Sequence, residues 1–142
     1  MRADRAPGAG AAFLAIVLAA AVASAQPAGA LGEAGQIALR QLDAFRHDDF
    51  DAAYGYASTD IRQMFDREAF ERMVRGGYPE IARSVSGVVT DGRVEPGRHA
   101  WLTLTIQGAN GRTVQAVYEL VWENGQWRIN GVVTRPDTSP KT

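Results

Sequence analysis

The chain has 142 residues, with an apolar fraction of 46% and a charged fraction of 22%, which is typical of one ordinary globular domain and excludes a disordered chain. The formal net charge of −1 provides no field that would attract nucleic acid or an anionic membrane, so neither is an expected partner. Cysteine is absent, which excludes disulfides, thiol catalysis and cysteine-based metal sites.

The N-terminal segment has the three parts of a secretory signal peptide. Arg2 and Arg5 give a positive start, the uncharged run from Ala11 to Val22 follows, and Ala23-Ser24-Ala25 places small residues where signal peptidase needs them. We therefore expect cleavage after Ala25 and export to the periplasm or beyond. The rival interpretation is a retained membrane anchor, but the run is shorter than the roughly 20 residues that span a bilayer.

The remaining chain divides into a short spacer, one domain and a tail. Gln26, the first residue after cleavage, begins a spacer of small residues, proline and glycine that ends at residue 32. Residues 33–134 form a single α+β domain by their patterning, and residues 135–142 are polar and rich in proline, as in a loose tail. The mature chain has no expected membrane contact.

Helical patterns occupy the first half of the domain. The helices predicted from apolar spacing and N-cap residues cover Glu33 to Arg46, Phe50 to Ala57 with Asp49 as its cap, and Arg67 to Arg75 with Asp66 as its cap. Ser58 or Thr59 caps a turn between the last two of these helices. The segment from Ile81 to Ser84 is either a short bridge or the first strand.

Strands follow, separated by turn signals. They are predicted at Val85 to Val89, His99 to Gln107, Arg112 to Glu123 and Gln126 to Thr134, with Asp91-Gly92 and Pro96-Gly97 marking the first connection. Asn124-Gly125 is a strong hairpin signal. It sets the register of the last two strands by pairing Trp122 with Trp127, Leu120 with Ile129 and Tyr118 with Gly131. On this register Val133 faces the core.

The hairpin between the second and third strands allows two registers. A two-residue loop would turn Trp101, Thr103 and Thr105 toward the core, whereas a three-residue loop with Gly111 left-handed turns Leu102, Leu104 and Ile106 there. Burying a large aliphatic side chain contributes roughly 1.5–3 kcal/mol. We therefore predict the three-residue loop.

This register leaves apolar side chains on the outer face of the sheet. They are Trp101, Val117, Val121 and Val132. Single apolar residues are normal on a surface, but a contiguous patch would serve as a partner surface, including one between two copies in a homodimer. Both interpretations stay open on the sequence.

Several stretches resemble known families. The segment from Phe45 to Tyr54 (FRHDDFDAAY) is similar to the helix-turn-helix start of the nuclear transport factor two-like superfamily, and Gly125 to Val132 (GQWRINGV) is similar to its final strand. A closer resemblance is to a secreted bacterial family, domain of unknown function 4864. It is carried by Asp48 to Tyr54, Met73 to Pro79 and Trp127 to Val132.

The resemblance implies a cone in which helices pack on a curved antiparallel sheet of about four strands, in an exported protein. It implies no mechanism, because the family has no established activity. The superfamily contains isomerases, dehydratases and epoxide hydrolases beside many binding domains, so the fold does not choose between catalysis and binding.

The residues that carry chemistry form no catalytic or metal motif. His47 and His99 lack metal-ligand spacing, and Asp48, Asp49 and Asp51 are explained by helix capping and the helix dipole. Glu119 lies on the outer face in the chosen register; only the other register would make it an acidic base inside the cone. We expect no catalytic residue, no metal and no cofactor.

The tyrosines Tyr54, Tyr78 and Tyr118 are the best candidates for lining a ligand pocket, since their hydroxyls need partners when buried; the alternative, which the pattern favours slightly, is a filled core in which they only pack. The sequence thus favours a non-catalytic binding domain, for a small apolar ligand in the cone or a protein on the outer face. The alternatives are an enzyme of isomerase or hydrolase type and a structural dimerisation subunit of the envelope.

Overall fold

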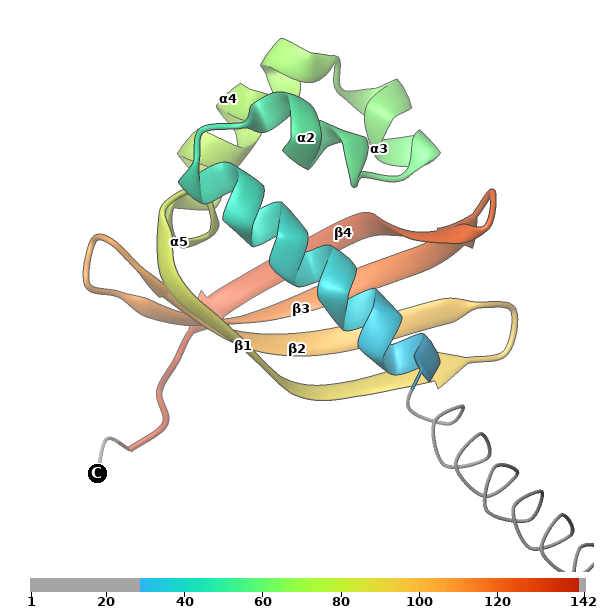
Figure 1. The fold of residues 1–142 in the computed structure, drawn as a ribbon. Coiled ribbons are helices and arrows are strands. Elements are labelled where there is room, and N and C mark those ends of the chain that lie inside the picture. The colour runs from blue at the N-terminus through green and yellow to red at the C-terminus, as the bar shows by residue number, and fades with distance from the viewer. Residues whose placement is uncertain (1–28, 141–142) are drawn as a thin grey trace, which may run out of the picture.

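The computed structural model describes residues 29–140 as helices followed by one curved antiparallel sheet (Figure 1). The strands are β1 (Ser84–Glu95), β2 (His99–Gly108), β3 (Thr113–Glu123) and β4 (Gln126–Pro136), in the order β1-β2-β3-β4. Each strand is joined to the next by a hairpin. The predicted α+β class, with N-terminal helices on a sheet of four strands, is confirmed.

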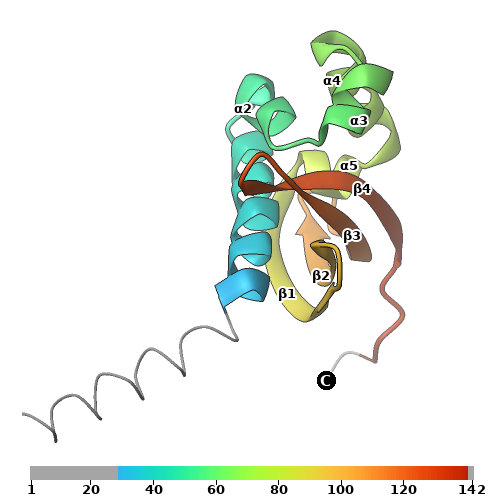
Figure 2. The same cartoon turned by 90° about the vertical axis from the view of Figure 1, so that its right-hand side faces the viewer.

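The helices lie on one side of the sheet. They comprise an N-terminal helix over residues 29–46, α2 (Phe50–Gly55), α3 (Thr59–Met64), α4 (Arg67–Gly77) and α5 (Pro79–Ala82). The N-terminal helix runs beside β1, and α2, α3 and α4 gather beyond its C-terminal end (Figures 1 and 2). The sheet bends around this helical layer, so one face of the sheet is covered and the other is not.

Side-chain caps start the short helices as predicted. The carboxylates of Asp49 and Asp66 accept hydrogen bonds from Ala52 N and Ala69 N, and the hydroxyl of Ser58 accepts one from Ile61 N. These caps satisfy backbone groups that the first turn of a helix leaves without partners. The break between the N-terminal helix and α2 and the start of α4 therefore follow from local sequence.

Several elements differ from the sequence prediction, and the turn expected after Ser58 is the helix α3. Residues 29–32, expected in the spacer, are helical, and β4 continues to Pro136, into the expected tail. Of the segment expected as a bridge or strand, Ile81 and Ala82 are helical in α5, since Pro79 at the first position is preset for a helix, and Ser84 begins β1. Asp91-Gly92 lies within β1 beside a bulge, and the connection to β2 is made only by Pro96, Gly97 and Arg98.

The register of the β2–β3 hairpin is the predicted one. The loop between Gly108 and Arg112 has three residues, Gly111 is left-handed at φ 82°, and Gly108 N donates to Arg112 O at 2.8 Å. Leu102, Leu104 and Ile106 are accordingly buried against the helical layer. The interior and exterior of the sheet are therefore assigned correctly for β2 and β3.

The β3–β4 register is correct near the turn and wrong beyond it. Trp122 pairs with Trp127 and Leu120 with Ile129, as predicted from the Asn124-Gly125 turn. A bulge then shifts the register, so Tyr118 pairs with Val132 instead of Gly131. Val132 consequently faces the helices and Val133 faces outward at 71% exposure, the reverse of the prediction.

Two glycines of β1 allow the N-terminal helix to approach the sheet closely. A Cβ atom on Gly87 would lie 2.7 Å from Leu42 Cδ1, and one on Gly92 would lie 2.8 Å from Leu31 Cδ1. Leu31 and Leu42 are separated by about 16 Å along the helix, and Gly92 and Gly87 are separated by about the same distance along β1. The helix and the strand therefore stay in contact at both points. The β1–β2 half of the core is filled as a result.

Candidate ligand pocket

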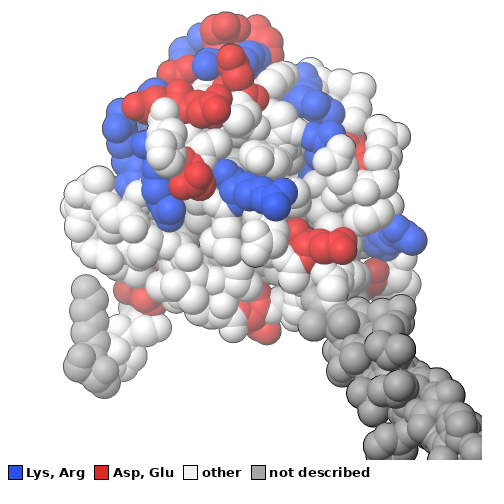
Figure 3. Space-filling model, viewed as in Figure 1, with Lys and Arg blue, Asp and Glu red and all other residues white. Residues whose placement is uncertain are grey.

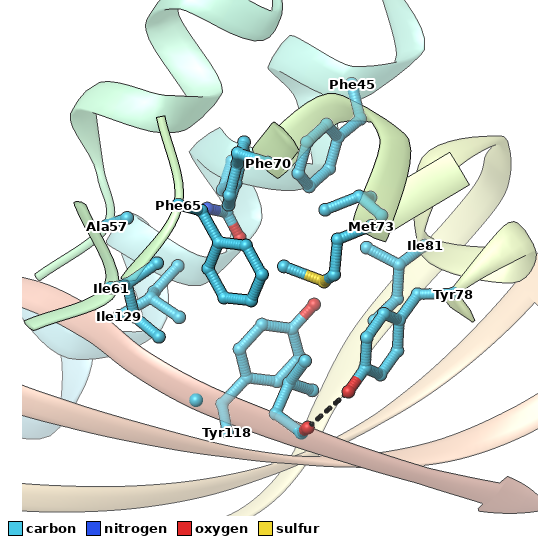
Figure 4. Close-up of a pocket in the computed structure, with 14 residues that line it drawn as sticks. Phe45, Ala57, Ile61, Phe65, Phe70, Met73, Tyr78, Ile81, Tyr118 and Ile129 are labelled. Carbon is cyan, nitrogen blue, oxygen red and sulfur yellow. Dashed lines mark hydrogen bonds between the residues drawn. The ribbon is translucent and has the colours of Figure 1, made fainter. Parts of the chain in front are cut away.

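A cavity of about 250 Å³ lies between the helical layer and the β3–β4 half of the sheet (Figure 4). Its lining is almost entirely apolar and comes from the N-terminal helix, the short helices and the two strands. The lining residues are Gln41, Phe45, Ala57, Ile61, Phe65, Phe70, Met73, Val74, Tyr78, Ile81, Tyr118, Ile129, Gly131 and Val132. Apolar walls with few polar groups are typical of small-molecule sites.

The cavity exists because the short helices attach to the edge of β4 rather than lying flat on the sheet. Ala57 forms a parallel bridge to Ile129, with Ser58 N donating to Ile129 O and Ile129 N donating to Tyr56 O, each at 2.8 Å. This junction fixes where α3 begins. The helices that follow therefore form a roof over β3, with space beneath it.

Tyr118 on β3 is the central polar residue of this pocket. Its side chain is fully buried, and the hydroxyl has no hydrogen-bond partner among residues 29–140. In Figure 4 the hydroxyl points into the space between Phe65, Met73 and Tyr78. Burial alone raises the pKa of this phenol far above its ordinary value of 10.0, so the group stays protonated and remains a donor.

The other polar groups of the lining are already engaged as donors. The Tyr78 hydroxyl donates to Val132 O at 3.2 Å, and the Gln41 amide nitrogen donates to Ala53 O at 3.0 Å. Both bonds tie the walls to neighbouring backbone, Tyr78 to β4 and Gln41 to α2. Tyr118 thus differs from these two residues because its polar atom makes no hydrogen bond within residues 29–140.

The predicted pocket tyrosines separate into two groups. Tyr78 and Tyr118 line the cavity, whereas Tyr54 lies behind its wall. The Tyr54 hydroxyl donates to Phe65 O at 2.6 Å, and its ring packs edge-on against Phe70 with centroids 5.3 Å apart. Tyr54 therefore holds the wall in place and does not contact the cavity.

Charged side chains cover the helices above the pocket, at the top of the view in Figure 3. Arg75 bonds the Glu71 carboxylate at 2.8 Å, and Arg67 bonds both Glu71 and the α2 residue Asp51. The hydrogen bonds from Arg75 and then Arg67 lower the pKa of Glu71. Arg75 also lies over the Phe50 ring, 4.4 Å from its centroid. This network fastens α4 to α2 and so supports the roof of the pocket.

The predicted partner surface is only partly assembled. Trp101, Val117 and Val121 lie on the outer face, each half-buried, but Val132 lines the pocket instead. Its expected place is taken by Val133, which the bulge turns outward next to Val117. The outer face therefore keeps a valine beside Val117, but Val133 supplies it instead of Val132.

Glu119 lies on this outer face, away from the pocket. One carboxylate oxygen is 2.5 Å from His99 Nε2, and the other accepts from the Asn130 amide at 3.2 Å. His99 also stacks on Trp101, with ring centroids 5.4 Å apart. The position of Glu119 is the one that the chosen register predicted.

The described part of the chain provides no metal centre: residues 29–140 bring together no cluster of three or more His, Asp or Glu suited to hold an ion. His47 is exposed on the N-terminal helix, and its ring lies 2.9 Å from Asp43 O. Across the same range, no helix is long and apolar enough to cross a membrane. The predicted cleavage site at Ala25 and Gln26 lies outside the described residues.

A family model, the domain of unknown function DUF4864, matches residues 33–142. The chain belongs to the DUF4864 family. No curated protein and no solved structure matches it. The DUF4864 match covers the whole sheet and every residue that lines the pocket, so the cavity belongs to the family's domain.

Sequence reasoning missed several pocket residues of this DUF4864 domain. Gln41 occupies a position of the apolar stripe that also carries Ala38 and Phe45, and a polar residue in such a stripe is a signal that it faces something other than solvent. Phe65 and Met73 carry no comparable signal. Whether these two side chains line a cavity depends on the distance between the sheet and the helices α3 and α4.

Proposed function

We propose that this protein is an exported binding domain that holds a small, mostly apolar molecule in the pocket above Tyr118. The observation that carries the proposal is the buried, unpartnered Tyr118 hydroxyl facing an apolar cavity of about 250 Å³. Leaving such a group unsatisfied costs about 1–3 kcal/mol. A ligand with a hydrogen-bond acceptor would remove this cost and fill the cavity at the same time.

The exported location and the wider relationship are part of the same proposal. The positive start, the apolar run and Ala23-Ser24-Ala25 support secretion to the periplasm or beyond, with cleavage between Ala25 and Gln26. The helix-covered curved sheet supports membership of the nuclear transport factor two-like superfamily. Many domains of that superfamily bind without catalysis, which agrees with a carrier or sensor role.

Binding is favoured over catalysis by the chemistry of the pocket lining. The lining carries neither carboxylate nor imidazole, so it offers no general base of the usual kind. Glu119, the acidic base of the enzyme alternative, is bonded to His99 on the opposite face of the sheet. The raised pKa of Tyr118 makes this phenol a poorer base candidate at neutral pH.

A second candidate function is a protein interface on the outer face of the sheet. Val133 on β4 is 71% exposed and Val88 on β1 is 58% exposed, and the half-buried Val117 on β3 lies beside Val133. A homodimer or an envelope partner would cover such side chains. This surface and the pocket lie on opposite faces of the sheet, so both functions are compatible.

The direct test is native mass spectrometry of the full chain expressed with export to the envelope. We expect the released protein to be cut before Gln26 and to retain a small molecule. In Val132→Phe the larger ring fills the pocket, and the molecule should be lost. Val133→Phe is the matched control: it makes the same substitution on the outward side of the same strand, and the molecule should stay bound.

Three results would count against parts of the proposal. A bound molecule that survives Val132→Phe and vanishes in Val133→Phe would place binding on the outer face. An intact mass that includes the first 25 residues would exclude cleavage. A change of subunit number in Val133→Phe alone would support the interface as the principal function.

A further inference from the structure

The pocket lining restricts the charge of any ligand that enters. None of the side chains around the cavity carries a formal charge at neutral pH. An ionised ligand would lose its hydration without gaining an ion pair, which is strongly unfavourable in an apolar site. The ion pairs of this region, such as Glu71 with Arg75, lie in the network over α2 and α4 and not in the lining.

The hydrogen-bonding pattern restricts the polar group of the ligand. Tyr78 and Gln41 each direct a donor to backbone, at Val132 O and Ala53 O, whereas the Tyr118 hydroxyl has no partner among residues 29–140. This hydroxyl is aimed into the cavity. The complementary group is an acceptor: a carbonyl, ether or hydroxyl oxygen, or an uncharged ring nitrogen.

A bound water would be a poor substitute for such a ligand. Water at a buried site needs about two to four polar partners, and apolar cavities stay dry. Tyr118 provides one such partner, and the lining around it includes aliphatic side chains such as Ile81 and Ile129. An apolar ligand with one acceptor atom therefore matches a lining with one unpartnered hydroxyl better than water does.

The size and the walls favour a compact ring compound. A cavity of about 150 Å³ holds benzene, so about 250 Å³ accommodates one ring with a substituent or two fused rings. Phe45, Phe65 and Phe70 provide flat aromatic surfaces for such a body. Long acyl chains exceed this size, and sugars have too many polar groups for this lining.

We infer that the pocket selects uncharged, ring-containing molecules of this size that present one hydrogen-bond acceptor to the Tyr118 hydroxyl. The inference rests on the proposed binding function and adds the chemical class of the ligand. It distinguishes neutral ketones, ethers and phenols from the corresponding carboxylates and amines.

Three probes of nearly equal size test this selectivity: ethylbenzene, acetophenone and benzoate. Dissociation constants are measured by ligand-observed NMR for the full exported chain and for Tyr118→Phe. For acetophenone we expect binding about three- to tenfold weaker in Tyr118→Phe, the range of one neutral hydrogen bond. Ethylbenzene should bind the variant at least as tightly as the natural protein, and benzoate should bind neither form measurably.

The outcomes separate this inference from the proposed function. If Tyr118→Phe changes the dissociation constants of acetophenone and ethylbenzene by the same factor, the hydroxyl has no role in selectivity, although the apolar pocket still binds. Benzoate binding as tight as acetophenone binding would overturn the charge selectivity. If none of the probes binds, or if their binding is unchanged in Val132→Phe, the pocket itself is not a binding site and both proposals fail.

Discussion

The two halves of the sheet support the same helical layer in different ways. Over β1 and β2 the N-terminal helix rests directly on the strands, because Gly87 and Gly92 leave room for Leu42 and Leu31. Over β3 and β4 the short helices stand on the β4 edge and enclose a cavity of about 250 Å³. Alternating apolar residues face inward from β2 and β3 alike.

The difference shows that strand patterning by itself does not determine whether a core is filled. A long helix placed on glycines closes one half, while helices of 4–11 residues fixed by caps and an edge bridge leave the other half open. Stability should therefore come mainly from the first half and ligand binding from the second. The following substitutions test this division.

The largest contrast is expected between truncations in the two halves. Leu104→Ala removes a fully buried side chain from the filled half and should lower the free energy of unfolding by about 3 kcal/mol. Val132→Ala removes methyl groups that already face the cavity, and should cost about 1 kcal/mol or less. Urea unfolding of both variants measures the difference. Equal losses would show that the two halves are packed alike.

The glycine contacts provide the next contrast. Gly87→Ala would place a methyl group 2.7 Å from Leu42 Cδ1, and the resulting overpacking should cost about 1–2 kcal/mol. Gly131→Ala is the control, since its Cβ atom would meet only Glu119 Oε1 at 3.7 Å. Thermal unfolding should separate the pair. If Gly87→Ala leaves the stability unchanged, the N-terminal helix does not pack closely on β1.

Tyr118→Phe examines the open half directly. In ligand-free protein the substitution removes an unsatisfied buried hydroxyl, so the free energy of unfolding should rise by about 1 kcal/mol. The pocket keeps its aromatic wall. A loss of stability of similar size would instead indicate that the hydroxyl bonds to a protein group.

The smallest effect concerns the charged network above the pocket. The pKa of Glu71 is lowered in the folded protein, so its contribution to stability is present above the ordinary value of 4.5 and is lost as pH falls below it. Glu71→Gln should therefore destabilise at pH 7 and approach the natural protein near pH 3 in unfolding experiments. Glu68→Gln is the control, because Glu68 forms no ion pair within residues 29–140. A constant difference across pH would contradict the role of the pair.

The sequence predicted the features that arise from local rules. N-caps at Asp49 and Asp66, the Asn124-Gly125 turn and the burial of Leu104 each follow from a few neighbouring residues. The filled half of the core could therefore be predicted from the pattern of apolar residues and turns. The outer position of Glu119 follows from the same register.

The open half depends on features without a local signal. The bulge in β4 exchanged Val132 and Val133, and two adjacent valines after Gly131 give alternation no means of choosing between them. The position of α3 and α4 above the sheet depends on the bridge between Ala57 and Ile129, which are far apart in the chain. Tyr118 was identified as a pocket residue by its type, but its missing partner is visible only in three dimensions.

Whether the Tyr118 hydroxyl meets a ligand inside an open pocket can be seen in a high-resolution crystal structure of the protein purified from its native source. We expect non-protein density in the cavity, with an acceptor atom within hydrogen-bonding distance of Tyr118 Oη. A pocket filled by protein side chains, with that hydroxyl bonded to one of them, would contradict the proposed binding site.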